Sequence, residues 1–270
     1  MNEVSSASGQ RGLNMPLHPA AGDDLEPRLY DFYRAAIRAL QRARVPFLVG
    51  GAYALASHTG VVRHTKDFDI FTRPSDCERV LEVFSAAGYR TEITDPCWLA
   101  KAFSGEDFID VIFSSGNCVA EVDEAWFHYA IDARVFGLPV QLCPAEETIW
   151  SKAFVMERER YDGADIAHLL RAYGERLDWH RLLERFDSHW RVLLSHLVLF
   201  GFIYPYERGC IPAFVMDTLL DRLRSEAHPP LTVGRLCQGT LLSKAQYTID
   251  LDRWGYEDAR LLPLKEKPVS

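Results

Sequence analysis

Three aspartates have the types and spacing expected of a cation-binding carboxylate group. Asp67 and Asp69 are separated by one residue, and Asp110 lies inside the apolar run 108–113. Alternate side chains of a β-strand share one face of a sheet, so Asp67 and Asp69 would lie together and a neighbouring strand could bring Asp110 beside them. Carboxylate oxygens are preferred ligands of hard cations. The three acids therefore predict catalysis of phosphoryl or nucleotidyl transfer with Mg²⁺ or Mn²⁺.

A glycine pair precedes these acids. Residues 45–49 predict a short buried strand, Gly50 and Gly51 follow it, and residues 52–57 are helix-prone. Glycine allows the backbone to approach a ligand closely, and the free N–H groups at a helix start attract anions. We therefore expect Gly50 and Gly51 to contact the phosphates of a nucleoside triphosphate.

Basic and hydroxyl side chains accompany the acids in a chain whose formal net charge is −8. Arg63, Thr65 and Lys66 precede Asp67 and are expected to bind the nucleotide phosphates. Lys152 lies on a predicted helix at or beside its apolar face. There it could either pack along the core or reach into a cleft and bind the phosphates.

The chain resembles the polymerase-β-like nucleotidyltransferase superfamily over roughly residues 30–200. Its signature is a glycine turn, a short helix, an Asp-x-Asp pair and a third acid on a strand. The matching residues are Gly50, Gly51, Asp67, Asp69 and Asp110, with Thr65-Lys66 at the basic position before the pair. The closest resemblance is to the bacterial abortive-infection type (AbiEii-like) branch, some of whose members are toxins of toxin–antitoxin pairs, and it implies an antitoxin partner.

Lys152 and the segment 158–165 are similar to helical motifs of that branch. Asp162 and Asp165, inside this segment, have a second interpretation. They are placed as the N-cap and N3 acids of the helix that follows, where carboxylates commonly satisfy free backbone N–H groups. The sequence leaves both interpretations open.

The aspartates near the glycine turn also have structural alternatives. Asp67 and Asp69 could cap local backbone groups at the edge of a loop. Asp110 could face water on an edge strand, although its apolar neighbours predict a buried strand, where a carboxylate needs a partner or a metal. Asp107 is a competing acid on the opposite face of that strand.

The predicted fold class is α/β (α+β): a nucleotidyltransferase-type mixed sheet flanked by helices and followed by a helical part. The expected domains are a disordered lead (1–26), an α/β domain (27–143), a helical domain (144–228) and a C-terminal extension (229–270), with the cleft between the middle two. Periodicity predicts helices at 27–44, 52–57, 74–87, 144–160, 163–173, 178–186, 188–203 and 211–226, and strands at 46–49, 67–72, 89–94, 107–113, 131–136 and 140–143.

Composition narrows the function classes. The chain has 270 residues, 48% of them hydrophobic, enough for one or two ordinary cores. Its most apolar stretch, 192–204, is shorter than a membrane span, and its start lacks the pattern of a secretion signal. Together with scattered cysteines, these features predict a cytoplasmic protein without membrane contact. Residues 152–191 hold eight Lys or Arg and eight Asp or Glu, so no basic stripe marks a nucleic-acid surface.

The resulting hypothesis is a metal-dependent nucleotidyltransferase. Two Mg²⁺ ions would be held by Asp67 and Asp69, with Asp110 joining one of them and helping to deprotonate an acceptor hydroxyl. An RNA 3′ end, a small hydroxylated molecule and a protein side chain all stay open as acceptors. The alternatives are a catalytically inactive binding or regulatory protein of a toxin–antitoxin type system, and a phosphohydrolase that uses water.

Overall fold

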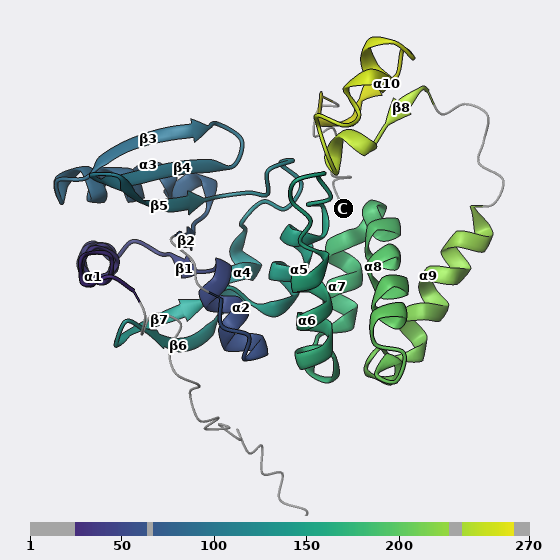
Figure 1. Ribbon diagram of the computed structural model, residues 1–270, viewed down its shortest axis with the longest axis horizontal. Coiled ribbons are helices and arrows are strands. Elements are labelled where there is room, and N and C mark those ends of the chain that lie inside the picture. The colour runs from purple at the N-terminus through teal and green to yellow at the C-terminus, as the bar shows by residue number, and fades with distance from the viewer. Residues whose placement is uncertain (1–24, 64–66, 227–233, 262–270) are drawn as a thin grey trace, which may run out of the picture.

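The computed structural model of the chain describes residues 25–63, 67–226 and 234–261. Outside them lie Thr65, Lys66 and residues 1–24 of the expected disordered lead. The expected phosphate contacts of Thr65 and Lys66 and the expected disorder of that lead therefore stay predictions. The described residues form a mixed seven-stranded sheet with helices around it, followed by a run of helices (Figure 1). The predicted fold class is confirmed.

The sheet is built by the first half of the chain. Its elements are α1 (Pro27–Ala43), β1 (Leu48–Val49), α2 (Gly51–Thr59), β2 (Phe68–Phe71), α3 (Pro74–Ala86), β3 (Arg90–Asp95), β4 (Leu99–Ser104), β5 (Asp107–Ile112), α4 (Glu124–His128), β6 (Ile131–Val135) and β7 (Leu138–Leu142). The strand order is β3-β4-β5-β2-β1-β7-β6. Pairing is parallel between β2 and β5 and between β1 and β7, and antiparallel elsewhere in this sheet.

The second part is helical, as expected. It contains α5 (Ala145–Ala153), α6 (Gly163–Tyr173), α7 (Trp179–Phe186), α8 (Trp190–Ile203) and α9 (Ala213–Ser225), with short 3₁₀ turns between some of them. A small two-stranded parallel sheet of β8 (Leu236–Cys237) and β9 (Glu257–Asp258), with α10 (Thr248–Asp252), follows. One continuous cluster of buried side chains extends from α1 to α9. No described helix is both long and apolar enough to cross a membrane.

Alternation along β2 decides which side chains face the site. Phe68 is buried and stacks on Tyr33 of α1, with ring centroids 5.0 Å apart. Ile70, two residues on, is also buried. Asp69 lies between them in sequence and therefore points to the opposite face of the sheet.

Some predicted elements were wrong in extent, and some observed elements were not predicted. Strand β4 and helix α4 were not expected. Helix α5 ends at Ala153. The prediction that residues 154–160 continue this helix was therefore wrong. The hairpin turn is Phe136–Gly137, both with positive φ, because Leu138 and Pro139 already pair with β6. A two-residue turn with left-handed backbone at both positions matches the twist of the flanking strands.

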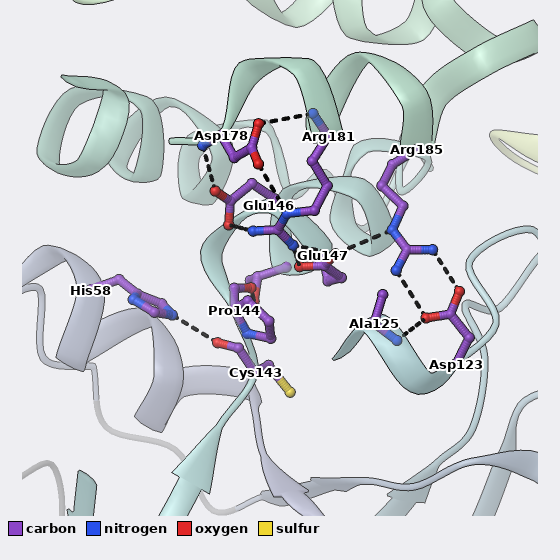
Figure 2. Close-up of polar contacts among 11 residues, drawn as sticks. His58, Asp123, Ala125, Cys143, Pro144, Glu146, Glu147, Asp178, Arg181 and Arg185 are labelled. Carbon is purple, nitrogen blue, oxygen red and sulfur yellow. Dashed lines mark hydrogen bonds and ion pairs between the residues drawn. The ribbon is translucent and has the colours of Figure 1, made fainter. Parts of the chain in front are cut away.

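A buried network of ion pairs fixes the first turn of α5 to its neighbours (Figure 2). Glu146 and Glu147 are buried there, and Arg181 of α7 binds both. Arg185 of α7 binds Glu147 at 3.1 Å and Asp123, the N-cap of α4, at 2.6 Å. The network therefore attaches α7 to α5 and to α4, the helix between β5 and β6.

Helix α2 is attached to the same junction by a separate contact. The His58 Nε2 atom lies 2.8 Å from the backbone oxygen of Cys143, between β7 and α5 (Figure 2). Burial lowers the pKa of His58. A neutral imidazole N–H can donate to this carbonyl, which ties the helix after the glycine turn to the helix that carries Lys152.

Two of the six cysteines are joined. Cys97, in the turn between β3 and β4, forms a disulfide with Cys118 in the loop after β5, with Cα atoms 5.9 Å apart. This pair was not predicted, because the two residues are 21 positions apart and belong to no spaced motif. The cytoplasmic location stays a prediction.

Candidate active site

The sheet brings Asp69 and Asp110 together. The two residues are direct partners in the parallel pairing of β2 and β5. Asp67 comes immediately before β2, two residues from Asp69, and is exposed. Asp107 does not join them, because it lies at the start of β5 and binds Arg28 of α1 at 2.6 Å. Of the two acids that the sequence offered on this strand, the structure therefore places Asp110 beside Asp69.

The glycine turn is packed directly against Asp69. Gly51 begins α2 with φ of +53°, and a Cβ atom added there would lie 1.7 Å from Asp69 Oδ2. The backbone N–H of Gly50 donates to the backbone oxygen of Asp69 at 3.0 Å. Only glycine combines this backbone conformation with this approach. The start of α2, with its free N–H groups, is thus held next to the central carboxylate.

Asp69 is the most perturbed acid of this group. Burial raises its pKa to about 6, and the nearby charges of Asp110 and Asp67 act in the same direction. Lys152 and Arg160 partly oppose this shift. None of the described cations forms an ion pair with Asp69. A cation placed at this carboxylate would therefore relieve the repulsion.

Asp110 has its own cation. Lys101, on the unexpected strand β4, lies directly opposite Asp110 in the antiparallel pairing, and its Nζ is 2.7 Å from Asp110 Oδ1. Burial nevertheless leaves the pKa of Asp110 raised, although Lys101 opposes the shift. Sequence analysis missed Lys101 because it missed the strand. The available signal was Gly105 between two alternating stretches, since a glycine with positive φ is typical of a tight hairpin turn.

Lys152 lies in a second charged cluster at the start of α6. Its Nζ is 2.8 Å from carboxylate oxygens of both Asp162 and Asp165. Burial acts to lower the pKa of Lys152, but the two carboxylates outweigh it and the net shift is upward. Arg63 also binds Asp165. Two of the cations expected at the nucleotide phosphates are thus paired with carboxylates in this structure.

The two interpretations of Asp162 and Asp165 can now be compared. Asp162 occupies the N-cap position of α6 and Asp165 the third helical position, as the capping interpretation predicts. The Asp162 side chain, however, makes no capping hydrogen bond and instead accepts one from Lys152. Both residues occupy helix-capping positions, but their carboxylates form ion pairs with Lys152.

The donor set fits a divalent ion in part. Asp67 and Asp69 offer carboxylate oxygens near one another in sequence, and the raised pKa of Asp69 reflects its burial first and then charge repulsion, which an ion would relieve. Within residues 25–63, 67–226 and 234–261, no three His, Cys, Asp or Glu side chains are close enough to form a complete cation site. Asp110 is instead engaged by Lys101. The fit therefore rests on Asp67 and Asp69.

A surface pocket elsewhere on the molecule is a weaker candidate for the active site. Its lining includes Gln41 of α1, Phe47 before β1 and Asp132 of β6, and none of the three aspartates of the site. Convergent acids and perturbed pKa values are the better guide to function, and both lie at Asp69.

Comparison with known proteins gave matches among solved structures only; no protein-family model and no curated protein matches the chain. The antibiotic-resistance factor ANT(2'')-Ia is 19% identical, with 64% of this chain and 98% of that chain covered and a TM-score of 0.46. The lincosamide antibiotic adenylyltransferase LnuA is 13% identical, covering 54% and 96%, with a TM-score of 0.38. The Megavirus polyadenylate synthase is 14% identical, covering 56% and 33%, with a TM-score of 0.37.

These neighbours include an adenylyltransferase and a polyadenylate synthase, names that belong to nucleotidyl transfer. The three TM-scores are below 0.5, so the likenesses carry no functional argument of their own. The resemblance to the abortive-infection branch is not tested by them and stays a prediction. The proposal below rests on the geometry around Asp69.

Proposed function

We propose that the protein is a metal-dependent nucleotidyltransferase that moves a nucleoside monophosphate from a nucleoside triphosphate to a hydroxyl acceptor. One observation carries the proposal: Gly51, at the start of α2, is packed against Asp69, and Asp69 lies opposite Asp110 on the neighbouring parallel strand. This places an anion-attracting helix start beside acids suited to a cation. A triphosphate bound with a divalent ion needs both.

The chain's own residues have separate tasks in this proposal. Asp67 and Asp69 would hold the ion, Mg²⁺ or Mn²⁺, which supplies charge neutralisation at the phosphates. The backbone N–H groups in the first turn of α2, which begins at Gly51, would bind phosphate oxygens, while Gly50, whose N–H already donates to Asp69, allows the close approach. Asp110 would accept the proton of the acceptor hydroxyl. The hydroxyl oxygen then bonds to the α-phosphorus, the bond from that phosphorus to the bridging oxygen breaks, and pyrophosphate leaves.

Lys152 would contribute charge from the helical side of the site. Its ammonium acts on Asp69 and is held by Asp162 and Asp165. Two carboxylates fix its position, so the ammonium is oriented before any nucleotide binds. Arg63 binds Asp165 as well and would likewise contribute positive charge near the phosphates. Thr65 and Lys66 stay as predicted phosphate contacts.

The proposal is tested with nucleoside triphosphates labelled at the α-phosphate, supplied with Mg²⁺ and with RNA, small hydroxylated compounds or protein as acceptor. We expect release of pyrophosphate and transfer of the label to one acceptor class. Asp69→Asn should lower the rate by about two to three orders of magnitude, because charge neutralisation at the phosphates is lost.

The matched control is Asp252→Asn, which changes an exposed acid of the chain's other Asp-x-Asp pair, on α10. It should retain full activity. Labelled monophosphate free in solution would instead identify a phosphohydrolase. Binding of nucleotide without turnover for any acceptor would favour the inactive regulatory protein, and the antitoxin partner implied by the toxin branch would then be sought by association.

A further inference from the structure

Three charged side chains form a row across three neighbouring strands. Asp69 of β2 is the direct partner of Asp110 of β5, and Asp110 is the direct partner of Lys101 of β4. Directly paired residues on neighbouring strands point to the same face of a sheet. Lys101 therefore lies on the face of the candidate site, on the side of Asp110 away from Asp69.

Lys101 is fixed in this row from two sides. Its Nζ is 2.7 Å from Asp110 Oδ1 and 3.6 Å from the centroid of the Phe108 ring, and its side chain is 19% exposed. An ammonium is attracted both to a carboxylate and to the face of an aromatic ring. Since Phe108 and Asp110 are alternate residues of β5, the strand holds both contacts on one face.

We propose that Lys101 is a built-in cation that takes the place of a second divalent ion at Asp110. This inference rests on the proposed function and refines it, because the site then holds one tightly bound ion, at Asp67 and Asp69. An ammonium in contact with Asp110 repels a further cation at the same carboxylate and already neutralises its charge. The absence of a complete three-acid cation site among the described residues agrees with this arrangement.

The test counts ions directly, using Mn²⁺ alone with the full chain, by calorimetry and by electron paramagnetic resonance. We expect one tight site in the unchanged protein. Lys101→Gln removes the charge and should add a second Mn²⁺ site with affinity within about tenfold of the first, because Asp110 becomes available to join Asp69. Lys101→Arg keeps the charge and should retain the single site.

The matched control is Lys244→Gln, at an exposed lysine of the C-terminal extension, which should leave the count at one. Thermal unfolding of each variant establishes that it is folded, and Lys101→Met serves as a second neutral variant. Two equally tight sites in the unchanged protein would overturn the inference, a result that needs no variant. An unchanged count in a folded Lys101→Gln protein would overturn it as well.

Failure of this inference is distinguishable from failure of the proposed function. If the unchanged protein transfers nucleotides but binds two Mn²⁺ ions tightly, the proposed function holds and the role of Lys101 is rejected. If instead the single tight site becomes two in Lys101→Gln but no acceptor is labelled, the role of Lys101 holds and the proposed activity is rejected.

Discussion

Two charged clusters lie at opposite ends of helix α5 and differ in how their charges are balanced. At its start, Glu147 is fully buried and bound by both Arg181 and Arg185. Near its end, Lys152 faces the cluster of aspartates, in which Asp69 has no ion-pair partner among the described residues. Each carboxylate of the first cluster has an arginine partner, whereas the central carboxylate of the second has none among the described residues.

The difference separates stability from chemistry. In a buried cluster where every charge has a partner, removing one member leaves an uncompensated charge inside the protein. A cluster with unmatched acids is costly without a cation, and such perturbed groups are concentrated at functional sites. Three substitutions sharpen this comparison, beginning with the one expected to have the largest effect.

Glu147→Gln should have the largest effect on folding. It leaves the Arg181 and Arg185 guanidinium groups without their shared buried carboxylate, which we expect to lower the free energy of unfolding by about 3–5 kcal/mol. Chemical denaturation measures the change. Mn²⁺ affinity of the folded fraction should stay the same, because none of the ion pairs of this cluster involves Asp69.

Glu184→Gln is the control for that substitution, since Glu184 is an exposed acid on the same helix α7. It should change stability by less than about 0.5 kcal/mol. Equal stability of the two variants would show that the network does not hold α7 in place, and the contrast between the clusters would fail.

Gly51→Ala should affect both folding and binding. A Cβ at this position would overlap the Asp69 carboxylate, and the backbone has φ of +53°. The strain should cost about 1–3 kcal/mol, and the displaced carboxylate should weaken Mn²⁺ binding. Thermal unfolding and calorimetry measure the two effects.

Gly105→Ala isolates the backbone part of this effect. Gly105 has φ of +67° and open space around the position of a Cβ atom. It should lose stability through backbone strain alone and retain full Mn²⁺ affinity. If Gly51→Ala also retained full affinity, the close approach at Asp69 would have no role in binding.

The pH dependence of stability tests the charge on Asp69 itself. The pKa of Asp69 is about 6 in the folded protein against an ordinary value of 3.8, so between these values the folded protein binds more protons at this group than the unfolded chain. Its contribution to stability is thus present below about pH 4 and is lost as the pH rises through 6. Asp69→Asn removes this titration.

The free energies of unfolding of the two proteins, measured without metal from pH 4 to pH 8, test this sign. The advantage of Asp69→Asn over the unchanged protein should be greatest near pH 8 and should shrink as the pH falls through 6. An advantage that grew on acidification would mean that Asp69 is stabilised as an anion in the fold.

Local sequence was sufficient for much of the fold and for the central acids. The apolar spacing of α1 and the proline at its start predicted that helix, since an amphipathic period and a fixed φ act over a few residues. The spacing of Asp67 and Asp69 predicted a shared face, because alternation is a property of any strand. Both inferences need only neighbours along the chain.

Tertiary structure alone decided which acids meet and which cations they bind. Choosing Asp110 over Asp107 depends on the register of β5 against β2, which sequence spacing does not specify. Lys101 reaches Asp110 only because β4 pairs with β5, and Lys152 binds Asp162 and Asp165 only because α5 ends at Ala153 and the chain turns into α6. Strand register and helix packing arise from contacts between distant segments, so the charge balance of the site follows from the folded chain.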